Sequence, residues 1–385
     1  MSRIEGISFL GVNVTPRTNW CFLLVRDAEG RTGLGECTLS NHEALLEAAV
    51  AALAARVAGQ DWRARNRLAR VLPHAPGGLV SQTVLSAFEQ ALWDLAGQAD
   101  GQPIHAMLGG AFRDPVPLYA NINRGASPRS PEGFRAAALR AQGAGFAAMK
   151  LAPFDPFVWE DATGPEARAA YAEGLARIAA VREAIGPEVE LMVDAHWRFS
   201  AGGAAALIRD VAEFRLHWLE CPVAEANHAE IRRLRGMAND RGMRLAGAES
   251  LCGLAAYRAL IEAGGYDVLM PDIKHCGGHA EMLRIAALAQ TAGVELAPHN
   301  PTGPICHAHS LHACAAIPNA GRLEVQFGET ERFFTLVAGG ESLRFRDGAG
   351  ALPPGPGLGV ALEEAEAAAT PWQPMPVPWL DPRLG

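Results

Sequence analysis

Three carboxylates end three successive apolar segments of this 385-residue chain. Asp194 follows VELMV, Glu220 follows LHWL and Glu249 follows MRLAGA, so the acids lie 26 and 29 residues apart. Each interval has room for one helix and one strand, which is the period of a barrel in which the two alternate. Parallel strands end at one rim, so the three side chains are expected to converge. Three oxygen ligands at one point suit a divalent cation such as Mg²⁺.

The alternation extends well beyond these segments. Between about 117 and 327, eight apolar segments with strand character are separated by segments with helical periodicity. Eight parallel strands predict a closed barrel whose chemistry sits at the strand C-terminal ends. We therefore predict an α/β fold with a barrel at 115–330. Residues 1–114 read as β-strands followed by helices, an α+β unit, and the tail at about 331–385 is expected to pack back on it.

Composition excludes several classes of partner. The chain is 49% apolar and 20% charged, carries a formal net charge of −8 and shows no basic stripe, so nucleic acid is not an expected partner. No apolar run approaches the ~20 residues that span a bilayer, and the N-terminus lacks a signal-peptide layout, so no membrane association is expected. The seven cysteines form no CxxC pair, which favours reduced thiols in the cytoplasm.

Polar side chains stand at the predicted end of every barrel strand. In chain order they are Asn121, Asn123 and Arg124, Lys150, Asp194 and His196, Glu220, Glu249, Asp272, His299, and Glu324. A single acid or histidine at such a position is usually structural. The complete set is hard to explain that way and predicts an active site at this rim.

Five further motifs carry a family resemblance. They are GLGE (33–36), ALWDLAGQADGQPIHAMLGG (91–110), PDIKHCGG (271–278), APHNPTGP (297–304) and PPGPGLG (353–359). With the three acids, these motifs resemble the mandelate racemase branch of the enolase superfamily over nearly the whole chain. DAHWR (194–198) and PHNPTGP are similar to the galactonate- and mannonate-dehydratase-like acid-sugar dehydratases.

The resemblance implies a fold and a set of roles. A capping domain from both chain ends would cover a (β/α)₇β barrel, and Mg²⁺ would bind Asp194, Glu220 and Glu249. Asp272 and His299 would form a catalytic dyad, and Glu324 would hydrogen-bond the substrate carboxylate. The family's habit of symmetric assembly implies a homo-oligomer.

Two departures from the racemase pattern indicate the reaction. A two-base racemase carries a second lysine two residues after the first, where this chain has Ala152, and asparagine where it has His196. Proton abstraction by His299, with Lys150 as an electrophilic partner of the carboxylate, gives an enediolate. A proton from His196 to the β-hydroxyl then completes dehydration of a 2,3-dihydroxy acid to a 2-keto-3-deoxy acid.

Other interpretations remain open. His196 could only hydrogen-bond a substrate hydroxyl, and the chain could be a racemase or epimerase of a hydroxy acid or amino-acid derivative, or a non-catalytic sugar-acid-binding protein. Lys274 and His275 are expected to face the outer helix layer or a neighbouring subunit. His307, His309 and His312 are expected at the surface.

Specificity is expected from the cap and from the first barrel strand. Candidate substrate contacts are Arg17, Asn19, Trp20, Asn121, Asn123 and Arg124, together with the segment APFD (152–155). The long loop 152–167 is expected to cover the site.

Overall fold

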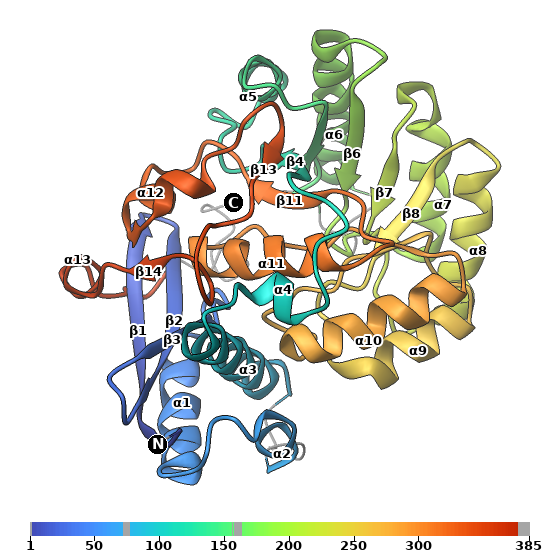
Figure 1. The fold of residues 1–385 in the computed structure, drawn as a ribbon. Helices are drawn as coiled ribbons and strands as arrows, with labels where there is room; N and C mark the ends of the chain where they lie inside the picture. Colours follow the sequence, from blue (N-terminus) through green and yellow to red (C-terminus); the bar gives the residue numbers. More distant parts are fainter. Residues whose placement is uncertain (1, 72–77, 156, 158–163, 376–385) are drawn as a thin grey trace.

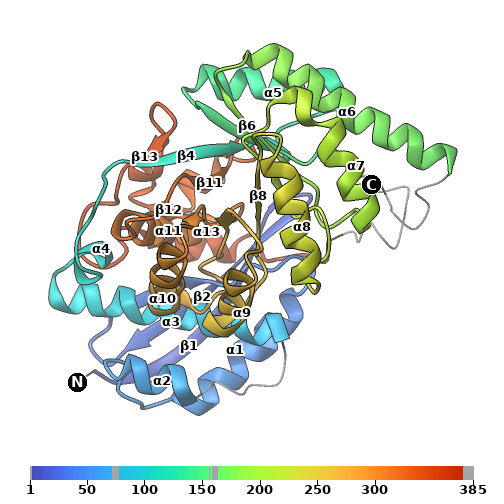
Figure 2. The same ribbon diagram turned by 90° about the vertical axis from the view of Figure 1, so that its right-hand side faces the viewer.

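The computed structural model describes residues 2–71, 78–155, 157 and 164–375. Figure 1 shows two parts: an antiparallel sheet with helices at the N-terminal end of the chain, and a ring of parallel strands surrounded by helices. Figure 2, turned by 90°, shows the first part lying against one side of the second. In the part of the chain that the structure describes, no helix is both long and apolar enough to cross a bilayer.

The N-terminal sheet is a three-stranded antiparallel meander backed by helices. Its strands are β1 (Ile4–Thr15), β2 (Thr18–Asp27) and β3 (Thr32–Glu36), in that order, and its helices are α1 (Glu43–Val57), α2 (Arg65–Val71), α3 (Gly78–Asp100) and α4 (Ile104–Met107). A Cβ atom on Gly35 would lie 1.9 Å from the Ala87 carbonyl oxygen, so the glycine lets α3 press directly onto β3.

Eight parallel strands form the barrel. They are β4 (Val116–Asn121), β5 (Ala148–Leu151), β6 (Glu190–Asp194), β7 (Trp218–Glu220), β8 (Arg244–Gly247), β9 (Val268–Leu269), β10 (Glu295–Leu296) and β11 (Leu323–Gln326). The helices between them are α5 (Pro131–Gly143), α6 (Pro165–Ile185), α7 (Ala201–Asp210), α8 (His228–Asn239), α9 (Gly253–Glu262), α10 (Gly278–Thr291) and α11 (Pro304–Ala316). The predicted (β/α)₇β order is confirmed.

Backbone hydrogen bonds close the barrel between its first and last strands. β11 pairs with β4, and β10 bonds the segment that leads into β11. The Leu296 amide donates to the Asn319 carbonyl at 3.0 Å, and the Gly321 amide donates to the Leu296 carbonyl at 2.7 Å. β6 and β10, four strands apart, therefore stand on opposite walls of the barrel.

One layer of side chains fills the barrel interior. Its members lie in the barrel strands other than β11, or one residue after them, and are Tyr119, Ala148, Met192, Trp218, Ala246, Val268, Met270 and Ala297. Side chains two residues further along a strand point the same way, so this layer fixes which residues reach the mouth of the barrel.

The tail returns to both parts of the molecule. The elements β13 (Ala349–Gly350) and β4 pair at the start of β4, while α13 (Glu364–Ala368) contacts β1, as Figure 1 shows. The remaining tail elements are α12 (Arg332–Thr335), β12 (Val337–Ala338), the 3₁₀ helix η3 (Gly340–Leu343) and β14 (Ala361–Leu362). The Trp372 amide donates to the Gly11 carbonyl at 3.0 Å, which joins the tail to β1.

The prediction for the histidines of α11 was wrong. His307, His309 and His312 are fully buried, because the cap and the tail cover the outer side of this helix. His309 Nε2 lies 2.9 Å from the Leu34 carbonyl of β3, and His312 Nε2 lies 3.1 Å from the Leu358 carbonyl of the tail. Burial lowers the pKa of His309 to about 3 and that of His312 to about 4.

Candidate functional site

The polar side chains predicted at the strand ends form a ring, the polar ring, directly above the interior layer. Asn121, Lys150, Asp194, Glu220, Asp272 and His299 each stand two residues beyond a member of that layer. Those within strands point into the barrel mouth by simple strand alternation. Asp272 and His299 keep the same spacing although they lie just beyond the ends of β9 and β10. Glu249 is three residues beyond Ala246 and would point outward from a regular strand. Ala248, with φ 78°, supplies the left-handed turn that redirects it.

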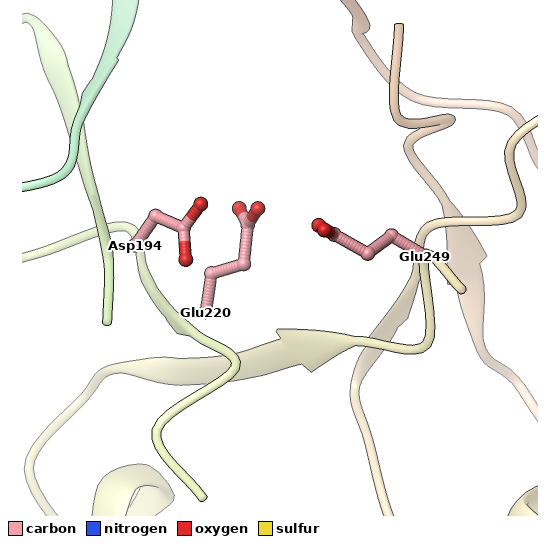
Figure 3. Close-up of side chains that lie close together, drawn as sticks. All are labelled: Asp194, Glu220 and Glu249. Carbon is pink, nitrogen blue, oxygen red and sulfur yellow. The ribbon is translucent and has the colours of Figure 1, made fainter. Parts of the chain in front are cut away.

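Three carboxylates converge at the mouth. Figure 3 shows Asp194, Glu220 and Glu249 pointing toward one another from β6, β7 and the end of β8. One oxygen of each lies within 4.8 Å of the others, and Asp194 and Glu220 are buried. Glu249 Oε2 is a buried atom with no hydrogen-bond partner among the described residues. A buried carboxylate oxygen left unpaired is costly, and a metal ion would satisfy it.

Electrostatics at the triad favour an added cation. Burial raises the pKa of Glu220 well above its usual range although Lys150 lies beside it, and burial likewise raises the pKa of Glu249. Asp194 contributes to both shifts through like-charge repulsion. A divalent ion would reverse this by stabilising the charged forms. The three carboxylates thus fit a divalent metal site by donor type, convergence and charge.

Lys150 occupies the floor of the mouth. Its Nζ lies 2.5 Å from Glu220 Oε1, 3.0 Å from Glu324 Oε1 and 3.9 Å from Asp194 Oδ2. Glu324 also accepts from Asn121 Nδ2 at 2.8 Å and from the Asn300 amide at 3.0 Å. Both oxygens of Glu324 accept. Burial opposes its charge, but Lys150, His299 and these hydrogen bonds together lower its pKa, so here Glu324 is an ionised group that anchors Lys150.

His299 belongs to a three-membered chain. Its Nδ1 lies 2.8 Å from Asp272 Oδ2, and the same oxygen accepts from Lys274 Nζ. Because a carboxylate only accepts, the ring proton is assigned to Nδ1. Nε2 lies 3.7 Å from Glu249 Oε1, beyond hydrogen-bond range. Burial opposes the charge on Asp272, but Lys274, His275 and His299 together hold the Asp272 pKa well below its usual range.

The structure corrects the placement of two neighbours of Asp272. Lys274 does not face the outer helices: it is 1% exposed, pairs with Asp272 and lines the cavity. His275 is buried, with Nδ1 2.8 Å from Thr83 Oγ1 of α3 in the cap. β9 ends at Leu269, so the residues after Asp272 form a turn and the alternation assumed for a strand does not apply.

His196 stands on the opposite wall. Its φ of 45° turns it over the end of β6, and its Nε2 lies 2.8 Å from Asp194 Oδ2. Its Nδ1 lies 2.8 Å from Asp155 Oδ1 in the loop after β5. Both ring nitrogens face carboxylates, an arrangement that requires a proton on each. Burial opposes that charge, but Asp194 and Asp155 outweigh it and raise the His196 pKa.

A cavity of about 830 Å³ connects the cap with this site. Of the predicted substrate contacts, it is lined by Arg17, Asn121, Asn123 and Arg124. The structure does not bring Asn19 or Trp20 there. Asn19 donates to Glu43 Oε1 at 2.9 Å, and Trp20 lines a separate cavity of about 510 Å³. Part of the loop 152–167, at residues 156 and 158–163, lies outside the described residues.

Asp155 and Arg129 both line the cavity. The sequence interpretation included Asp155 in a candidate contact segment, 152–155, but did not pair it with Arg129. Arg129 Nη2 lies 2.9 Å from Asp155 Oδ2, and the two residues come from loops after different strands. Asp155 follows Lys150 by five residues at a strand end, which was the available signal. No sequence pattern near Arg129 predicts that it lines the cavity.

Comparisons with known families cover most of the chain. The mandelate racemase/muconate lactonizing enzyme N-terminal domain family matches residues 10–109. The enolase C-terminal domain-like family matches residues 133–366.

Full-length relatives agree with these matches. A D-galactonate dehydratase of Xanthomonas oryzae pv. oryzae is 31% identical over 352 residues, covering 90% of this chain and 89% of the relative. One from Verminephrobacter eiseniae is 32% identical over 359 residues, covering 91% and 90%.

Solved structures show the same architecture. A mandelate racemase/muconate lactonizing enzyme-like protein from Rubrobacter xylanophilus has a TM-score of 0.87 and 31% identity, covering 97% of this chain and 99% of that one. An enolase from Agrobacterium radiobacter, with bound sodium and L-malate, has a TM-score of 0.82 and 27% identity, covering 96% of each chain.

Proposed function

The chain belongs to the mandelate racemase/muconate lactonizing enzyme family of the enolase superfamily, and from this premise we propose that it is a Mg²⁺-dependent acid-sugar dehydratase. The proposed reaction converts a 2,3-dihydroxy acid into a 2-keto-3-deoxy acid. The observation that carries the proposal is a histidine on each wall of the cavity, with the carboxylate triad between them. The D-galactonate dehydratases among its relatives support the reaction class.

Asp194, Glu220 and Glu249 would hold Mg²⁺, as their donor type and the unpaired Oε2 of Glu249 support. When bound, the ion would supply positive charge beside the substrate carboxylate and lower the cost of the dianion formed on loss of the α-proton. Lys150, held by Glu324, would add a second positive charge at the floor of the site.

His299 would act as the base. Its Nδ1–H is held by Asp272, which leaves Nε2 directed away from that carboxylate to accept the α-proton. Lys274 helps fix the Asp272 carboxylate in this position. Ala152, where a second lysine base would stand, is a buried residue without a titratable group, and this argues against two-base racemisation.

His196 would act as the acid. It approaches from the wall opposite His299 and would give a proton to the departing β-hydroxyl, which leaves as water. His299 takes one proton from C2, and the hydroxide that leaves C3 combines with the proton from His196 to form water. The resulting enol then takes a solvent-derived proton at C3 as it becomes a ketone.

The remaining contacts would set specificity. Arg17 of the cap and Asn121, Asn123 and Arg124 of the barrel would read the distal hydroxyls of the sugar acid. We place the cap at 1–114, completed by about 331–385, and the barrel at 115–330. We also propose a homo-oligomer in the cytoplasm, which light scattering and cell fractionation would test.

A panel of aldonic and aldaric acids, incubated with the protein and Mg²⁺ and assayed for 2-keto acids, tests the function. Keto-acid formation from at least one compound is expected. Exchange of the α-proton without keto acid would indicate an epimerase. Absence of both reactions, with binding retained, would indicate a non-catalytic binding protein.

A further inference from the structure

We propose that Asp155 is a positioning residue for the dehydration step, acting through His196. This inference rests on the proposed function, since it assigns Asp155 to the proton-donating wall of that site. It concerns a residue in the loop after β5, outside the polar ring of strand ends. The hydrogen bond between Asp155 Oδ1 and His196 Nδ1, at 2.8 Å, carries the argument.

The Asp155 carboxylate is itself held on several sides. Arg129 Nη2 lies 2.9 Å from Asp155 Oδ2, and Arg198 Nη2 lies 3.6 Å from Asp155 Oδ1. A carboxylate hydrogen-bonded by one guanidinium group and attracted by a second can fix a neighbouring ring, because its own rotation is restricted. The chain Arg129–Asp155–His196 thus connects the ends of β4, β5 and β6 at the cavity wall.

Arg129 does not need Asp155 to stay in place. It also donates to the backbone carbonyls of Asn123 at 3.1 Å and Ala152 at 2.9 Å, which tie the two loops together without any carboxylate. Holding Arg129 in place therefore does not require Asp155, and the carboxylate can instead position the His196 ring. Both Asp155 and His196 line the substrate cavity, so the pair faces the reaction and not the protein interior.

The arrangement matches the pair that holds the base. In both, a carboxylate oxygen lies 2.8 Å from Nδ1 of the histidine, and Nε2 is directed toward the carboxylate triad. An acceptor at Nδ1 fixes the ring orientation and keeps a proton on that nitrogen, so that Nε2 is the atom presented to substrate. Asp155 would give His196 the orientation that Asp272 gives His299.

A double-mutant cycle tests this inference. The Mg²⁺-loaded variants Asp155→Ala, Asp155→Asn, His196→Asn and Asp155→Ala/His196→Asn are compared for keto-acid formation and for α-proton exchange in D₂O. Asp155→Ala should lower dehydration about 100-fold, the scale of one acid–base contribution, and leave exchange within about threefold. The double variant should be no slower than His196→Asn, because Asp155 acts through that ring.

Asp155→Asn keeps an acceptor for Nδ1 and should recover part of the rate. The control Asp210→Asn alters a carboxylate that accepts from Tyr171 Oη at 2.7 Å and should match the wild type. Ring ¹⁵N signals of His196 should show a fixed Nδ1–H in the wild type and averaging in Asp155→Ala. Dehydration by Asp155→Ala at the wild-type rate, or additive losses in the double variant, would overturn the inference. A wild type that dehydrates nothing would instead overturn the proposed function.

Discussion

His196 and His299 face one cavity from opposite walls of the barrel, since β6 and β10 are four strands apart in a ring of eight. The two rings differ in which of their nitrogens have a carboxylate oxygen within hydrogen-bond distance. His196 has carboxylate oxygens 2.8 Å from both nitrogens, whereas His299 has one at 2.8 Å from Nδ1 and none closer than 3.7 Å to Nε2 among the ion pairs of the described residues. One ring is arranged to give a proton and the other to take one.

This difference predicts separate phenotypes. His196→Asn should lower keto-acid formation about 100-fold or more, because the β-hydroxyl loses its proton donor, and should leave α-proton exchange much less affected. The two rates are measured in one D₂O incubation by NMR. Equal loss of both would remove the proposed division of labour between the histidines.

Much of this site could be predicted from strand alternation alone. Asp194, Glu220 and His299 stand in phase with the interior layer, so their convergence follows from the fold. Glu249 is out of phase with the interior layer and reaches the mouth only because Ala248 has a left-handed backbone. No local sequence pattern predicts that conformation. The spacing of the apolar segments placed Glu249 at the correct rim of the barrel, but it did not give the backbone turn that directs the side chain inward.

The failures have equally specific causes. Lys274 was misplaced because β9 ends early and a turn follows it. The histidines of α11 were misplaced because the chain ends that cover this helix are far from it in sequence. Asp155 was not paired with His196, since the two belong to loops after different strands.

Metal removal should have a thermodynamic signature apart from activity. Addition of Mg²⁺ to the chelator-treated protein at 100 times its Kd should raise the free energy of unfolding by about 2.7 kcal/mol. Glu249→Gln should lose most of this gain, because one of three charged ligands is gone. Denaturation with and without Mg²⁺ measures the effect, with the exposed Glu341→Gln as a control. An equal gain in Glu249→Gln would contradict the assigned ligand set.

The buried pair of Lys274 and Asp272 predicts a charge-dependent stability. Lys274→Met should lower the free energy of unfolding by about 3 kcal/mol, since it leaves a buried carboxylate short of one cation. Lys274→Met/Asp272→Asn removes both charges and should recover part of that loss. Urea denaturation compares the variants. A double variant less stable than Lys274→Met would show that the charge is not the cause.

The buried histidines of α11 predict sensitivity to acid. The folded-state pKa of His309 is about 3, below the unfolded value of ~6.5, so below pH 6.5 the unfolded state alone takes the proton and stability falls. Between pH 6.5 and 4.5 the free energy of unfolding of the wild type should fall by about 2.3 kcal/mol more than that of His309→Gln. Denaturation curves across this range test it, with exposed His42→Gln as the control. Parallel pH profiles for wild type and His309→Gln would contradict the prediction.

The most direct measurement follows one reaction by ¹H NMR in D₂O, with Mg²⁺-loaded protein and a dehydratable sugar acid from the panel. The α-proton signal should disappear in step with the appearance of a 2-keto-3-deoxy acid that carries deuterium at C3, and His299→Asn should show neither change. Loss of the α-proton without keto acid in the wild type, or turnover by His299→Asn, would contradict dehydration initiated at His299.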